Sequence, residues 1–215
     1  MRAWIAYAAT VLVISSGLFA SSATAEPSPD AAPGVAAYEA GDYARAYELL
    51  KPVADGGHLE ARYLMARLSS VLIPERVDYT AALTYLDKPT RCQSPAALGL
   101  YASLVGEVGG TEAARIREAE LYKEAAEAGD LGSLRNLGYV LVKHLDRSFL
   151  GGAYLLEAAR RGDEQSQAFI DGLLEDKALA PAVGRFEKIE EEQTFDARWP
   201  LLDRNIRECQ FSEAQ

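Results

Sequence analysis

Histidine and cysteine are scarce in this chain: its 215 residues include two of each. We interpret His58 and His144 as surface or helix-capping residues, because each stands beside an expected helix end or exposed turn. There is also no glycine-rich phosphate loop, no nucleophile elbow and no spaced set of metal ligands. We therefore expect no catalytic residues, no metal and no cofactor, and a binding protein rather than an enzyme.

Signals for β-structure are absent as well. No run of alternating β-branched residues and no Asn-Gly hairpin occurs, and Ala, Leu, Glu and Arg dominate the chain, which favours helices. Positive charge is in deficit, since 22 Lys and Arg stand against 32 Asp and Glu for a net charge of −10. This balance argues against nucleic acid and anionic lipid surfaces as the main partner, and it leaves proteins open.

The first 25 residues differ from the rest. Arg2 is the only charge, the apolar run WIAYAATVLVISSGLFA follows, and Ala23 and Ala25 are the small residues that signal peptidase tolerates before its cut. A retained membrane anchor is the weaker alternative, because serine and glycine at 15–17 interrupt a run that is short for a bilayer. We expect 1–25 to be a signal peptide and the mature protein, with its net charge lowered from −10 to −11 by the loss of Arg2, to be soluble in the periplasm without stable membrane insertion.

A flexible Pro/Ala linker is expected over 26–34, and a repeated pattern follows it over 35–174. In three of four copies a small residue lies four positions after a glycine, and in every copy a large apolar residue lies four positions after the small one, as in Gly129, Ser133 and Leu137. The small positions are 36, 36 and 33 residues apart: Ala61, Ala97, Ser133 and Ser166. A second position recurs eight residues before each of them: Val53, Pro89, Ala125 and Ala158. Four copies in one register predict stacked helix pairs, in which the glycine ends the first helix and the small residue lets the second approach closely. In the second copy Gln93 replaces the glycine.

The third copy, LYKEAAEAGDLGSLRNLG at 121–138, resembles the Sel-1-like repeat, a relative of the tetratricopeptide repeat. The matching positions are Leu121 and Tyr122 for the aromatic pair, Ala125 and Ala126, Gly129, Ser133 for the later alanine, and the closing Leu137 and Gly138. The copy around 79–104 departs most, through KPTRCQSP, and is either a regular repeat or an altered connector. The resemblance implies an exported bacterial member with an all-α fold, a right-handed superhelical solenoid of antiparallel helix pairs.

The C-terminal residues 175–215 are expected to form capping helices that close the end of the stack. They carry the apolar side chains Phe186, Ile189, Phe195, Trp199, Leu202 and Ile206. The acidic run 190–192 is interpreted as a solvated face rather than a metal site, because three adjacent carboxylates on a helix point in different directions.

The only two cysteines are Cys92, in an irregular turn, and Cys209, which we expect in the last helix. A disulfide between them is the favoured interpretation for an exported chain, and a redox or intermolecular thiol pair and two buried free thiols are the alternatives. The bridge would close a loop of more than 100 residues, and the chain-entropy model predicts a stabilisation of up to about 4 to 5 kcal/mol.

Surface residues of the second helices are the candidates for binding a partner. The resemblance implies that these helices line the concave side, and the side chains off the seam there are Tyr63, Arg67, Arg135 and Tyr139. Tyr and Arg are enriched at interaction hot spots, and a solvated face is the alternative. By resemblance, the protein is a protein-binding scaffold or adaptor of an envelope or polysaccharide-secretion assembly, or a regulator of a sensor kinase. A cell-wall-directed enzyme or glycan-binding protein is the alternative.

Overall fold

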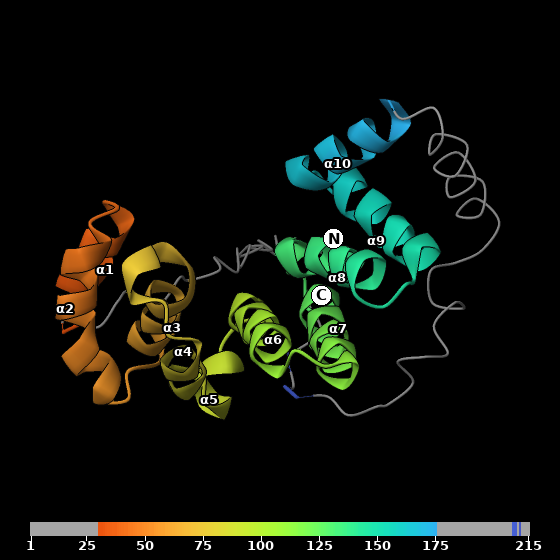
Figure 1. Ribbon diagram of the computed structural model, residues 1–215. Helices are drawn as coiled ribbons and strands as arrows, with labels where there is room; N and C mark the ends of the chain where they lie inside the picture. Colours follow the sequence, from red (N-terminus) through yellow and green to blue (C-terminus); the bar gives the residue numbers. More distant parts are fainter. Residues whose placement is uncertain (1–29, 176–207, 210, 212–215) are drawn as a thin grey trace, which may run out of the picture.

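The computed structural model describes residues 30–175, 208, 209 and 211 (Figure 1). The expected signal peptide 1–25, the linker residues 26–29 and the segment 176–207 of the expected cap lie outside the described residues. Within the described part the structure is helical and contains no strand, as the sequence predicts.

Consecutive helices pack against one another in chain order, from α1 in orange to α10 in blue in Figure 1. The helices are α1 (Ala32–Glu39), α2 (Tyr43–Asp55), α3 (Leu59–Arg67), α4 (Tyr79–Tyr85), α5 (Lys88–Arg91), α6 (Pro95–Gly109), α7 (Glu112–Glu127), α8 (Leu131–Lys143), α9 (Ser148–Arg160) and α10 (Glu164–Glu175). A π-helical turn at Leu68–Leu72 and a 3-10 turn at Pro74–Arg76 join α3 to α4. Helix α1 begins inside the segment 26–34 that was expected to be linker, and Pro33 suits its first turn because a helix needs no N–H there.

One connector geometry ends the first helix of three pairs, α2/α3, α7/α8 and α9/α10. Its glycines adopt the left-handed conformation that the sequence predicts: Gly57, Gly129 and Gly162, at φ +93°, +101° and +94°. The N–H of the following residue donates to a carbonyl five residues back: His58 to Val53, Asp130 to Ala125 and Asp163 to Ala158, at 3.3, 3.0 and 2.9 Å. These carbonyls belong to the recurring position eight residues before the small one, so that position marks the end of the first helix.

The residue after each of these glycines also begins the second helix. Its side chain accepts a hydrogen bond from the backbone N–H three residues on: His58 from Ala61, Asp130 from Ser133 and Asp163 from Ser166, at 3.3, 2.8 and 2.7 Å. The prediction that His58 caps a helix is confirmed, since its Nδ1 is the acceptor. A single residue therefore ends the first helix and begins the second, which explains why a short loop is enough to join the two helices.

The small positions of the repeat are buried, as predicted. Ala61, Ala97, Ser133 and Ser166 are at most 1% exposed, and the apolar residues one turn further on are buried too: Met65, Leu137 and Ile170. Ser133 lies against Gly99 of α6, where an added Cβ would come within 2.3 Å of the serine Oγ. The second helices α6 and α8 thus approach closely, and a larger residue at either position would separate them.

The second helix pair is an altered one. Its first helix is split into α4 and α5 by Leu86 and Asp87, and the Asp87 carboxylate accepts hydrogen bonds from the backbone N–H and hydroxyl of Thr90 at 3.1 and 2.7 Å. Where the other pairs have the connector glycine, the Gln93 side chain donates to the carbonyl of Leu59 at 3.2 Å. In the KPTRCQSP segment, KPTR therefore forms α5 and residues 92–94 form a modified connector, although Ser94 still caps α6.

No helix within the described residues is both long enough and apolar enough to cross a membrane.

Candidate functional site

Two of the predicted partner-binding residues, Tyr63 and Arg67, lie half-buried on α3. The Arg67 guanidinium stands 5.5 Å from the centroid of the Tyr38 ring, a cation–π contact with α1. Tyr63 packs against the apolar residues of both the first and the second helix pair, and burial raises the pKa of its hydroxyl. Both side chains therefore hold neighbouring helices together.

The other two predicted residues, Arg135 and Tyr139, lie half-buried on α8 and contact α10 or its cap. Arg135 donates to the Asp163 carboxylate at 2.6 Å. Burial alone would raise the pKa of Asp163, but hydrogen bonds from Ser166 and the charge of Arg135 hold it below its ordinary value. The Tyr139 ring meets Phe169 edge to face, with centroids 5.4 Å apart. Their role in binding a partner stays a prediction, and the structure shows that they join successive helix pairs.

Large apolar side chains that remain exposed are concentrated at one kind of junction. Six residues, 37 to 65% exposed, lie in or beside the three segments that connect a second helix to the next first helix; we name them the apolar edge: Val71, Val77, Tyr79, Val108, Ile116 and Phe149. Only Leu59, among the large exposed apolar residues of the described part, lies at the other kind of junction. All six lie at junctions of the same kind, between a second helix and the next first helix.

The sequence alone did not lead to the apolar edge, although it carries a signal for it. Single exposed apolar residues are ordinary on protein surfaces. Their recurrence at three equivalent junctions is a clearer signal. It can be seen in the sequence once the boundaries of the helix pairs are known. Exposed apolar residues that recur at equivalent positions are candidates for an interaction surface.

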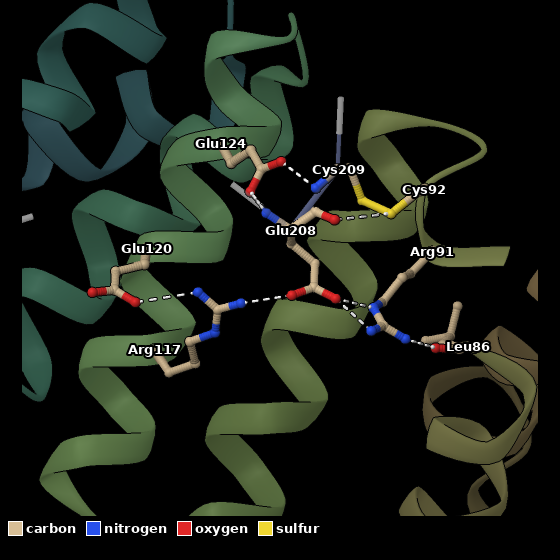
Figure 2. Close-up of polar contacts among 8 residues, drawn as sticks. All are labelled: Leu86, Arg91, Cys92, Arg117, Glu120, Glu124, Glu208 and Cys209. Atoms are coloured by element: carbon tan, nitrogen blue, oxygen red, sulfur yellow. Dashed lines mark hydrogen bonds and ion pairs between the residues drawn. A yellow bond between two sulfur atoms is a disulfide. The ribbon is translucent and has the colours of Figure 1, made fainter. Parts of the chain in front are cut away.

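The two cysteines form a disulfide, with their Cα atoms 5.3 Å apart (Figure 2). The bridge joins the C-terminal end of α5 to a segment 117 residues away. Cys209 does not lie in a helix, so that expectation was wrong. The physical reason is that the backbone N–H groups of Glu208 and Cys209 donate to the Glu124 carboxylate of α7, at 2.7 and 2.6 Å, instead of to helical carbonyls.

Two arginines hold the side chain of Glu208 next to the bridge (Figure 2). Arg91 donates through Nε at 2.9 Å and also through Nη2, and Arg117 donates at 2.8 Å. Burial opposes ionisation of Glu208, but these charge-assisted hydrogen bonds lower the pKa of its carboxyl below the ordinary value. We name Arg91, Arg117 and Glu124 the tail clamp, since together they bind the segment that carries Cys209.

One signal in the sequence could have revealed part of the tail clamp. Arg91 precedes Cys92 and Glu208 precedes Cys209, so a bridge between the cysteines places opposite charges side by side. Glu124 gives no such signal. It occupies an ordinary helix position, and only the fold reveals that it is 7% exposed and faces the backbone of the C-terminal segment.

The described residues offer a hollow and no metal-binding cluster as candidate sites for small ligands. Over residues 30–175, 208, 209 and 211, no three His, Cys, Asp or Glu side chains are grouped so that they could hold a metal ion. An open hollow of about 570 Å³ lies at the start of the described chain, and its lining consists of Asp30, Pro52, Val53, Gly56, Gly57 and His58. His58 already uses Nδ1 to cap α3.

No family model, no curated protein and no solved structure matches the chain. The fold and the sites described above define an all-α protein of consecutively packed helices, with an apolar edge and a disulfide-linked C-terminal segment.

Proposed function

We propose that this chain is an exported scaffold or adaptor that binds a protein partner along its apolar edge. The observation that carries the proposal is the recurrence of exposed apolar side chains at the three junctions between second and first helices. A partner that covers them removes apolar surface from water at several points at once, which favours association.

The repeated connector supports the architecture that goes with this function. A positive-φ glycine followed by a capping residue ends the first helix of three pairs. The same unit used several times is the design of helical solenoids, which present extended surfaces to protein partners. We assign the chain to a right-handed solenoid of the Sel-1-like type on this basis.

The proposed location is the periplasm. The N-terminal pattern of one charge, an apolar run and small residues is typical of a signal peptide. The Cys92–Cys209 disulfide agrees with it, because disulfides persist in oxidising compartments. The partner class we propose is therefore an envelope protein, either part of a polysaccharide-secretion assembly or the outer domain of a sensor kinase.

Site-specific photocrosslinking in the native envelope tests this function. A photoreactive amino acid replaces Val77, Val108 or Phe149 in the apolar edge, and Leu59, which is also exposed but lies at the other kind of junction, serves as the matched control. We expect the same discrete envelope protein to be captured from all three edge positions and not from Leu59. Capture from Leu59 to the same extent, or capture of no protein from the edge, would contradict the proposal.

A further inference from the structure

The tail clamp has the layout of a peptide-binding site. The Glu124 carboxylate accepts two consecutive backbone N–H groups, and Arg91 and Arg117 converge on the side-chain carboxylate of the first of those two residues, Glu208. The bound segment is thus recognised through its backbone and through one negative charge. Such pairing of charged groups with hydrogen bonds gives both strength and orientation.

The arginines of the clamp are held in place by the body of the protein. Arg91 also donates to the carbonyl of Leu86 at 3.1 Å, and its guanidinium stacks 4.5 Å from the centroid of the Tyr101 ring. Arg117 also pairs with Glu120 at 3.3 Å. Groups positioned by such contacts lose little freedom when a ligand arrives, which is the basis of preorganised binding.

An apolar contact extends the site beyond the clamp. Phe211, three residues after Glu208, packs against the buried cluster that is built mainly from α6, α7 and α8. The bound motif therefore consists of a glutamate followed three residues later by an aromatic side chain. Cys209, between them, is 3% exposed and joined to Cys92.

We propose that the tail clamp is a docking site for peptides with a glutamate and an aromatic residue three positions later, occupied in the oxidised protein by the chain's own Glu208, Cys209 and Phe211. Reduction of the Cys92–Cys209 bridge by a dithiol makes this occupant exchangeable. The dithiol gives two electrons and two protons, the bridge becomes two thiols, and the reductant becomes a disulfide. A partner segment of the same chemistry then competes for the clamp.

The bridge controls whether an added peptide can compete for the tail clamp, because it keeps the chain's own segment at the site. While the disulfide is intact, the segment is held covalently next to the clamp and a free peptide cannot displace it. After reduction the segment stays attached only through the polypeptide, so it competes as an ordinary tethered ligand with a finite effective concentration. Binding of an added peptide should therefore depend on the redox state.

Fluorescence anisotropy with a labelled peptide tests the proposal on the full mature chain. The peptide has the sequence of residues 206–211 with Cys209→Ser, and it is titrated into the oxidised chain and into the chain treated with dithiothreitol. We expect at least tenfold tighter binding to the reduced chain, and at least a tenfold loss when the peptide also carries Glu208→Gln. Equal binding in both states, no binding to the reduced chain, or indifference to the glutamine substitution would overturn the proposal.

Variants of the chain provide the matched comparison. Arg117→Gln is expected to weaken peptide binding at least tenfold, whereas Arg45→Gln, at an exposed position on α2, leaves it unchanged. Far-UV circular dichroism of each sample shows whether it remains helical. Should reduction unfold the chain, amide hydrogen exchange in the oxidised state decides: Glu124→Ala, which removes both acceptor oxygens, must speed exchange at Glu208 and Cys209 at least tenfold, and unchanged exchange overturns the proposal.

The inference does not rest on the proposed scaffold function. The clamp lies on α5 and α7 and uses charged groups, whereas the scaffold proposal concerns apolar residues at the helix junctions. Failure of the peptide titration leaves the crosslinking result intact, and the reverse holds as well.

Discussion

The connector between α7 and α8 and the one between α5 and α6 perform the same task with different chemistry. In the first, Gly129 takes a left-handed conformation and the Asp130 carboxylate caps α8. In the second, Gln93 stands in place of the glycine and Ser94 caps α6 with the same hydrogen bond to the N–H three residues on.

What differs is the range of the contacts that hold the two connectors. The α7–α8 turn is satisfied by hydrogen bonds within six residues of sequence. The α5–α6 turn depends on Leu59, 34 residues away, and on the bridge to Cys209, 117 residues away. The loss of a local turn signal is thus compensated by distant contacts, and the two connectors should respond differently to substitution.

The largest effect is expected from removal of the bridge. Reduction, or Cys92→Ser, should lower the free energy of unfolding by about 4 to 5 kcal/mol, because the unfolded chain is no longer closed into a loop of this length. Urea titrations of the oxidised and reduced protein measure the change. A loss below about 1 kcal/mol would mean that the reduced native chain does not hold the two cysteines together, so that Arg91, Arg117 and Glu124 bind the distant segment only weakly.

A smaller effect is expected from the local turn. Gly129→Val should cost about 1 to 2 kcal/mol, because a side chain branched at Cβ is strained at φ +101°. The control is Gly172→Ala in α10, where an added Cβ meets nothing within 4 Å, and there we expect a gain of up to about 1 kcal/mol. Thermal unfolding of both variants measures the difference, and a neutral Gly129→Val would contradict our account of the connector.

The two caps should then contribute equally. Asp130→Ala and Ser94→Ala each remove one hydrogen bond to a helix N-terminus, at 2.8 and 3.2 Å, and each should cost about 1 kcal/mol. Ser148→Ala, at an exposed first position of α9, is the control and should change stability by less than about 0.5 kcal/mol. A much larger loss at Ser94 than at Asp130 would show that the altered connector depends more on its cap.

The smallest effect concerns the pH dependence of the distant segment. The pKa of the Glu208 carboxyl is lower in the folded protein than its ordinary value of 4.5. Its contribution to stability is therefore complete above that value and is lost as the pH falls through the lowered pKa. We expect the stability difference between the wild type and Glu208→Gln to shrink over that range in urea titrations, whereas Glu48→Gln, in an exposed ion pair, shows little difference at any pH. A constant difference for Glu208→Gln would contradict the ion pairing at the clamp.

Local features of the fold could be predicted from the sequence. The helical class, the turn glycines, the buried small positions and the capping role of His58 all follow from residues within a few positions of one another. The bridge between the cysteines was the favoured of three interpretations, because there are only two cysteines to pair. Short-range hydrogen bonds and helix periodicity depend on residues that are close together in the chain, so a single sequence is enough to predict them.

Contacts between distant residues could not be predicted in the same way. Arg135 and Tyr139 were expected at the surface, but Asp163 and Phe169 of the next pair lie against them. Glu124 was not recognised as the group that binds the C-terminal segment, because nothing near it in the sequence indicates a partner 84 residues away. Both failures have one cause: the sequence shows which face of a helix is apolar, but not which side chains of another helix reach it.

The bridge also determines how the molecule would carry mechanical tension. The chain from Cys92 to Cys209 is a closed ring that contains α6 to α10, while α1 to α5 precede it. A force applied to the chain on either side of this ring would run through α1 to α5, cross the sulfur–sulfur bond and leave at Cys209. The helices inside the ring would be shielded from the pull, and the helices before it would be the ones to yield.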